Sequence, residues 1–149
     1  MKFEKFLKSV GTHGLIYKRA NGESWLICAG VGMKIPLGVD NLLGIGEVPE
    51  KVKKVIEAII KADTSDRVEL ERATIPADGK AGDIVRIFGD GLLFEVGISN
   101  ADFGLLEKGD INLAELEVED EETGIEERYL LVLDHSDEVV GFIKGTDEF

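Results

Sequence analysis

The most reactive side chains lie in a glycine-rich stretch near the N-terminus, GTHGLIYKRANGESWLICAGVGMKIPLG, residues 11–38. This stretch holds the single cysteine, Cys28, and one of the two histidines, His13. A thiol beside an imidazole can act as a nucleophile with its general base. However, no third group orients the histidine, and free cysteines are commonly small buried apolar residues. Cys28 and His13 are a candidate catalytic pair for which we favour a structural interpretation.

The position of a predicted hairpin turn decides whether the side chains of Cys28 and His13 lie close together. Asn21-Gly22 is a strong signal for a two-residue hairpin turn, because both positions of such a turn need a positive φ. Centring the turn there predicts three opposed pairs: Leu15 with Cys28, Tyr17 with Leu26 and Lys18 with Trp25. His13 would then share a sheet face with Cys28, at a diagonal separation of about 7–8 Å.

Two further polar segments are candidate metal sites. His135 lies in LDHSDEV, residues 133–139, where acidic neighbours could bind a cation. A polar turn between two strands is the favoured interpretation of that segment. The run EVEDEETGIEE, residues 117–127, resembles a calcium loop, but a loop that starts at Glu119 places Leu130 where a carboxylate is required. We predict no metal.

The glycines of GVGMKIP, residues 30–36, do not match a phosphate-binding loop. A Walker A loop needs its lysine to be followed by Ser or Thr and then a helix. Lys34 is followed by Ile35-Pro36, which cannot continue as a helix. The strand–glycine–helix order of a dinucleotide site is also missing. We predict no cofactor, and the sequence favours a protein without enzymatic activity.

Two segments have the apolar spacing of amphipathic helices. Residues 2–10 repeat apolar side chains at i, i+3, i+4 and i+7, and Gly11 ends this helix. Residues 49–62 begin at Pro49, which suits a first helical position, and extend the same spacing over more turns. We therefore expect one short and one longer helix.

Strands dominate the chain from residue 66. Beyond the hairpin, the candidates are RVELERAT (67–74), DIVRIFG (83–89), LLFEVGI (92–98), LAELEVED (113–120), ERYLLVLD (127–134) and EVVGFIK (138–144), with one helical turn within ADFGLLEKGD (101–110). This pattern predicts an α+β protein, a mostly antiparallel β-sheet with two amphipathic helices packed on one face. We expect a single globular domain over residues 1–149, with the last few residues frayed.

Charge is distributed unevenly along the chain. The net charge is −13, with a balance of +2 in residues 1–75 and −15 in residues 76–149. The acidic second half permits mimicry of nucleic acid, although its acids alternate with apolar residues as on any solvated sheet. The chain has one cysteine, no secretory signal and no apolar run near the roughly 20 residues of a membrane helix. We predict a cytoplasmic protein without membrane contact.

Seven of the twelve lysines fall on the two predicted helices. If the helices lie side by side, six of them form one basic face: Lys2, Lys5, Lys8, Lys51, Lys54 and Lys61. Such a face suits contacts with duplex DNA that are independent of base sequence. The alternative is two ordinary solvated helices in which Glu4, Glu50 and Glu57 partly neutralise the lysines.

This arrangement, two basic helices on a strand-rich acidic body, is similar to one domain of a sliding clamp for DNA polymerases. In that family subunits join by strand pairing, and basic helices line a hole around duplex DNA. Separately, the segment KFLKSVGTHGLIYKRANGESWLICAGVGMKIPLGVDNLLG, residues 5–44, resembles small uncharacterised proteins of phages and prophages of Gram-positive bacteria. That resemblance implies a viral or prophage origin, with the bacterial host cytoplasm as the location, and transfers no catalytic residue.

Three functional hypotheses follow. The first and favoured one is a non-enzymatic phage or prophage accessory protein that acts through self-association or protein binding, as a homo-oligomer or with a protein partner. The second is a clamp-like ring or other duplex-binding module that uses the lysine-rich helical face. The third is a small cysteine-dependent hydrolase that uses Cys28 and His13.

Overall fold

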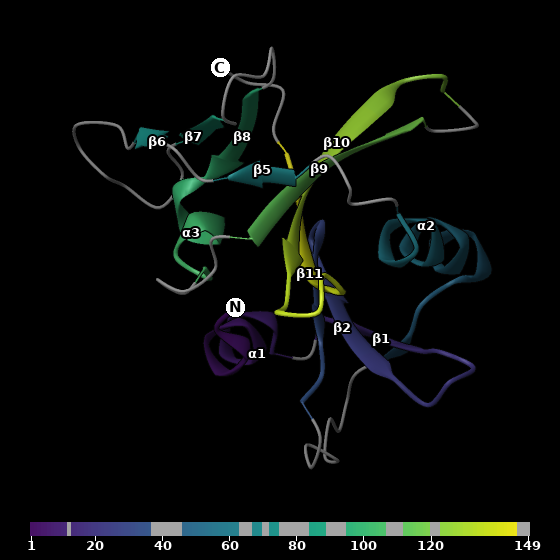
Figure 1. Ribbon diagram of the computed structural model, residues 1–149. Helices are drawn as coiled ribbons and strands as arrows, with labels where there is room; N and C mark the ends of the chain where they lie inside the picture. Colours follow the sequence, from purple (N-terminus) through teal and green to yellow (C-terminus); the bar gives the residue numbers. More distant parts are fainter. Residues whose placement is uncertain are drawn as a thin grey trace.

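The computed structural model describes residues 1–11, 13–36, 46–62, 67–69, 72–74, 84–88, 95–106, 112–119 and 123–145. These parts contain three helices, α1 (Phe3–Val10), α2 (Glu50–Ile60) and α3 (Asn100–Phe103). They also contain eleven strands: β1 (Leu15–Lys18), β2 (Ser24–Cys28), β3 (Val31–Lys34), β4 (Gly46–Glu47), β5 (Arg67–Glu69), β6 (Arg72–Thr74), β7 (Ile84–Phe88), β8 (Glu95–Ser99), β9 (Asn112–Glu119), β10 (Glu126–Leu133) and β11 (Val139–Lys144) (Figure 1).

The strands form two sheets. Eight of them pair in the order β4-β1-β2-β3-β11-β10-β9-β5, and the remaining three in the order β6-β7-β8. Every pairing is antiparallel except that between β1 and β4. The predicted α+β class, with its mostly antiparallel sheet, is confirmed.

The two long helices cover opposite faces of the large sheet, so the expectation that both pack on one face is wrong (Figure 1). Phe6 and Val10 of α1 belong to a cluster with Leu130 of β10. Ile56 of α2 belongs to a second cluster, with Leu131 of the same strand. The reason is the unbroken apolar run at residues 129–133. Successive residues of a strand point to opposite faces of the sheet, so this run makes both faces apolar, and each face must be buried by a helix or another element.

The β1–β2 hairpin forms as expected, but its predicted register is wrong by one residue. The Gly22 amide donates to the Arg19 carbonyl, and of the residues in this turn only Gly22 has a positive φ, of 91°. A type I turn followed by a left-handed glycine makes a three-residue loop, whereas the predicted two-residue turn needs positive φ at both central positions. The observed pairs are Leu15 with Ile27, Ile16 with Leu26, Tyr17 with Trp25 and Lys18 with Ser24.

The predicted strand over residues 67–74 is also divided. Residues 67–69 pair with β9 at one edge of the large sheet, while residues 72–74 pair with β7 in the small sheet. The helical turn expected within residues 101–110 corresponds to α3, which begins one residue earlier, at Asn100. The fraying expected at the C-terminus falls on residues 146–149, outside the described residues.

Gly32 of β3 leaves room for an aromatic ring in the core. A Cβ at this position would overlap with two ring carbons of Phe142 and would lie 2.9 Å from Cδ1 of Ile27. We expect Gly32→Ala to lower the free energy of unfolding by about 1–3 kcal/mol through overpacking. Urea unfolding measures this loss. Gly46→Ala is the control, since its Cβ would make only an ordinary 3.6 Å contact with Leu15, and equal losses in both variants would contradict the overpacking argument.

Candidate functional site

The corrected hairpin register removes the shared strand face on which the candidate catalytic pair was predicted. Ile27, not Cys28, lies opposite Leu15, so the Cys28 side chain belongs to the other face of the sheet. There it packs against the cluster that includes α1. His13 is exposed in the connection between α1 and β1, where its amide donates to the Val10 carbonyl. The shared face that would have joined thiol and imidazole is absent, and the reactivity of Cys28 stays a prediction.

The segment around His135 is a tight turn between β10 and β11. The Asp134 carboxylate accepts hydrogen bonds from the amides of Ser136, at 2.8 Å, and Glu138, at 3.0 Å. Asp137 has a positive φ of 63°, which closes the turn. The interpretation of this segment as a polar turn is confirmed. Within the described ranges, no three His, Cys, Asp or Glu side chains are grouped so that they could hold a metal ion.

A network of charged and polar side chains ties α2 to the β1–β2 hairpin. Glu57 of α2 accepts a hydrogen bond from the Tyr17 hydroxyl at 2.5 Å and another from Arg19 Nε at 2.8 Å. Arg19 also contacts Glu23 at 2.7 Å, and Glu23 contacts Lys34 Nζ at 3.2 Å. Sequence reasoning missed this network, because no local pattern links a helix residue to strand residues about 40 positions away.

The network shifts the ionisation of its members. Hydrogen bonds from Arg19 and Tyr17 outweigh burial and lower the pKa of Glu57 to about 2. Burial, together with the hydrogen bond to Glu57, raises the pKa of Tyr17 to about 12. For Glu23, burial opposes ionisation, but the hydrogen bonds from Arg19 and Lys34 prevail and the pKa is lowered. At neutral pH these carboxylates are ionised and Tyr17 is a neutral hydroxyl, so the network holds no poised base or nucleophile.

A shallow pocket of about 290 Å³ lies beside this network, between the hairpin turn, the end of α2 and the β10–β11 turn. Its charged lining residues are Arg19, Lys34 and Lys61 with Glu23, Asp137 and Glu138. Three positive and three negative side chains give the wall no net charge. The cations are already engaged, since Lys61 lies 3.4 Å from Glu57 and the other two contact Glu23. The pocket therefore marks a structural junction rather than a site selective for one ion.

The six lysines proposed for DNA contact do not lie on one face. Lys2, Lys5 and Lys8 belong to the α1 side of the large sheet, and the others belong to the α2 side (Figure 1). Lys5 Nζ donates to the Gly104 carbonyl at 3.1 Å. DNA binding stays a prediction, without the single basic face on which it was based.

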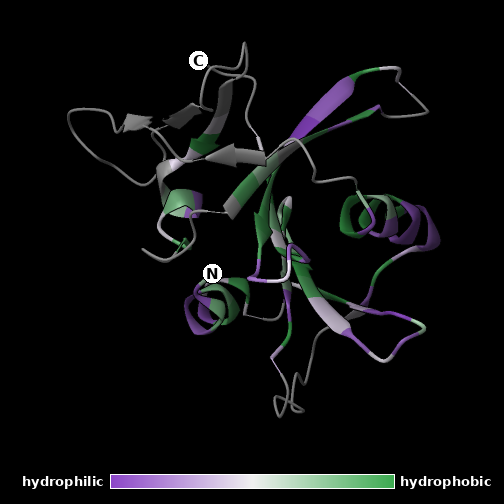
Figure 2. Cartoon of the chain, viewed as in Figure 1, coloured by the Kyte–Doolittle hydropathy of each residue, from purple (hydrophilic) through white to green (hydrophobic). Residues whose placement is uncertain are grey.

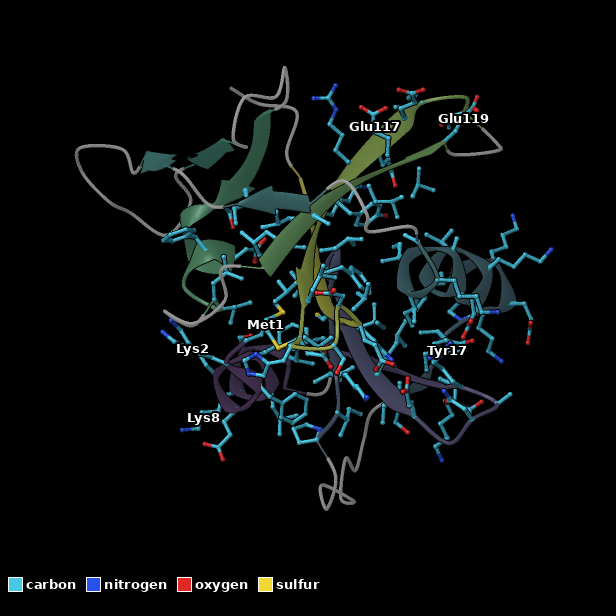
Figure 3. The ribbon with its side chains drawn as sticks, viewed as in Figure 1. Met1, Lys2, Lys8, Tyr17, Glu117 and Glu119 are labelled. Carbon is cyan, nitrogen blue, oxygen red and sulfur yellow. The ribbon has the colours of Figure 1, made fainter. Side chains whose placement is uncertain are left out.

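The outer half of the β9–β10 hairpin projects beyond the core (Figures 1 and 2). We call residues 116–119 and 126–129 the arm. Leu116 and Val118 point to one side and pack against the cluster that includes α2. The opposite side carries the residues that we call the acidic face: Glu117, Glu119, Glu126 and Arg128. Figure 3 shows Glu117 and Glu119 on the side of the arm away from α2.

Two carboxylates of the acidic face are placed against each other. Glu119 and Glu126 are directly opposed across the two strands, an arrangement that destabilises a sheet. Neither has an ion-pair partner within the part of the chain that the structure describes, whereas Glu117 contacts Arg128 at 3.2 Å. Ile125, beside Glu126, is 59% exposed. The arm thus carries two carboxylates without ion-pair partners among the described residues, an exposed apolar side chain adjoins it at Ile125, and the acidic run at residues 117–127 was its sequence signal.

Comparison of the chain with protein-family models, curated proteins and solved structures finds no match. None of the helices in the described ranges is long and apolar enough to cross a membrane. The candidate site therefore rests on the geometry of this chain alone.

Proposed function

We propose that the protein acts without catalysis, by binding a protein partner, and that the arm is its contact element. One observation carries this proposal, the direct opposition of Glu119 and Glu126 at the exposed end of the hairpin. Positively charged groups of a partner would relieve the repulsion between these carboxylates. Local violations of stabilising rules of this kind are expected at functional sites.

The chemistry of the arm favours a partner with a basic protein surface and an apolar contact. The acidic face has three carboxylates and one guanidinium, so its net charge is negative. Ile125 adds an exposed aliphatic side chain at the end of the arm. Charges on an exposed face mainly accelerate and select association, and each contributes little affinity. The proposed binding is therefore transient and sensitive to salt.

A labelled lysine octapeptide tests the arm directly. We expect it to bind the wild-type protein, and we expect Glu117→Gln, Glu119→Gln and Glu126→Gln together to weaken binding by roughly tenfold, as for loss of a few rim charges. Fluorescence anisotropy measures the affinity. The acidic face loses its attraction for the peptide while the fold keeps side chains of the same size.

The matched control changes three exposed glutamates elsewhere, Glu4→Gln, Glu47→Gln and Glu50→Gln. Each triple variant removes three negative charges, so the net charge changes by +3 in both. We expect the control to bind the octapeptide nearly as well as the wild type. Equal weakening in the two variants would show that the peptide responds to total charge, and the arm would then not be the site.

A further inference from the structure

The turn of the β1–β2 hairpin contains the single Asn-Gly pair of the chain, Asn21-Gly22. Asparagine is a chemically labile residue, because the backbone nitrogen of the next residue can attack its side-chain carbonyl carbon. A glycine in that next position has no Cβ to hinder the approach. Both members of the pair are exposed, so water and base reach them. The other asparagines precede residues with side chains: Asn41 precedes Leu42, Asn100 precedes Ala101 and Asn112 precedes Leu113.

We propose that Asn21 is a site of spontaneous deamidation in the folded protein. Base removes the Gly22 amide proton, and the nitrogen then bonds to Asn21 Cγ while the side-chain nitrogen takes up a proton and leaves as ammonia. The product is a succinimide ring, which water opens at either carbonyl. One opening gives aspartate, and the other gives isoaspartate, in which the main chain runs through the former side chain. The reaction consumes only water, and the site is separate from the arm and independent of the proposed function.

The turn holds both reacting groups in hydrogen bonds that act in opposite directions. The Gly22 amide donates to the Arg19 carbonyl at 3.0 Å, so this bond must break before the nitrogen loses its proton and attacks. Asn21 Oδ1 accepts a hydrogen bond from the Glu23 amide at 3.0 Å. Negative charge develops on that oxygen during the attack, and a donor already in place stabilises it, as in an oxyanion hole. The barrier that the fold adds is therefore the opening of one exposed turn, which takes little free energy.

The product changes the junction between the hairpin and α2. Asn21 lines the pocket beside the network, where positive and negative side chains are equal in number. A carboxylate at this position competes with Glu23 for Arg19 and Lys34, which contact Glu23 at 2.7 Å and 3.2 Å. Isoaspartate also adds a methylene group to the main chain of the loop. The longer loop strains the hydrogen bond from the Arg19 amide to the Glu23 carbonyl, at 2.8 Å, so isoaspartate should destabilise the hairpin more than aspartate does.

Peptide mapping by mass spectrometry tests the site after the protein has aged in mildly alkaline buffer. We expect conversion at Asn21 to be at least about tenfold faster than at Asn100 or Asn112, which lack a following glycine. The same chain in urea is the positive control and should react up to about tenfold faster than the folded protein, the scale of one hydrogen bond. Asn21→Gln is the matched variant, because the longer side chain closes its ring far more slowly, and it should keep its mass.

Two results of the mapping would overturn the inference. Folded protein that keeps its mass at Asn21 while the chain in urea is converted would show that the turn blocks the reaction. Equal rates at Asn21, Asn100 and Asn112 would show that the glycine and the turn select nothing.

Urea unfolding of the aged protein tests the effect on the hairpin. The isoaspartate form is separated by chromatography and compared with the variant Asn21→Asp, which carries the same charge on an unchanged main chain. We expect the isoaspartate form to unfold at a lower urea concentration than Asn21→Asp. Identical unfolding of the two would contradict the strain that we assign to the longer loop.

Discussion

Truncation of Trp25 to alanine is expected to lower the free energy of unfolding by about 3–5 kcal/mol, the range for large aromatic residues in a core. Trp25 is fully buried on the α2 side of the sheet, and its ring stacks on Phe142 with the centroids 6.1 Å apart. Phe142 in turn packs edge-on against Tyr129. Removal of the indole leaves a cavity beside Phe142 in this aromatic group, and guanidinium unfolding measures the loss.

Trp25→Phe should lower the free energy of unfolding by much less, no more than about 1.5 kcal/mol, because two effects oppose each other. The indole Nε1 is buried and donates no hydrogen bond to any residue in the described ranges. Phenylalanine removes this unsatisfied donor while it keeps most of the aromatic contact. If the phenylalanine and alanine variants were equally unstable, the indole nitrogen would have a partner and the account of the site would be wrong.

Glu57→Ala is expected to lower the free energy of unfolding by about 2 kcal/mol at pH 7, the scale of hydrogen bonds to a charged group. The carboxylate is 25% exposed and accepts hydrogen bonds from Tyr17 and Arg19. Its removal releases α2 from the hairpin and leaves the Arg19 side chain, 15% exposed, with Glu23 as its remaining ion-pair partner among the described residues. Glu50→Ala on the same helix is the control, since its carboxylate is 85% exposed and its loss should change stability by less than about 0.5 kcal/mol.

The contribution of Glu57 should depend on pH in a defined window. Its pKa is lowered from 4.5 to about 2 in the folded protein. The stabilisation is therefore fully present above pH 4.5 and is lost as the pH falls toward 2. The difference between wild type and Glu57→Ala should shrink over that interval, and a difference that is constant from pH 7 to pH 2 would contradict the network.

Tyr17 adds a second window at high pH. Its pKa is raised from 10.0 to about 12 in the folded protein. The contribution of Tyr17 to the free energy of unfolding is therefore present below pH 10 and is lost as the pH rises toward 12. Both losses arise from one cluster of contacts. Stability set by this network is therefore greatest between the two windows.

Local patterns in the sequence predicted most of the elements but not their arrangement, and they missed β4 and the division of residues 67–74 into β5 and β6. The 3.6-residue spacing of Phe6 and Val10 and of Ile56 and Ile59 correctly placed α1 and α2. The turn signal at Asn21-Gly22 correctly placed a hairpin. The register of the hairpin depended on whether Gly22 alone or both Asn21 and Gly22 adopt a positive φ. Asn is compatible with either conformation, so the sequence did not decide between the two registers.

The prediction of how the elements are arranged failed where pairing between strands far apart in the sequence decides it. The apolar run at residues 129–133 could have indicated a strand buried on both faces, and hence helices on opposite sides. Nothing local indicated that β3 pairs with β11 or that residues 67–74 contribute to two sheets. The acidic face of the arm was visible as a charged run, but its opposed glutamates follow only from the strand register.

The pairing of β3 with β11 has a consequence for synthesis of the chain. Val31, Gly32 and Met33 take their neighbours from residues 141–143, so the middle of the large sheet is joined by segments far apart in the sequence. During synthesis β3 is made long before β11, so one edge of β3 is without its pairing strand until the end of the chain is available. Such distant pairing slows folding. An unpaired strand edge can pair with another strand, so this edge of β3 is open to wrong pairing until β11 is made.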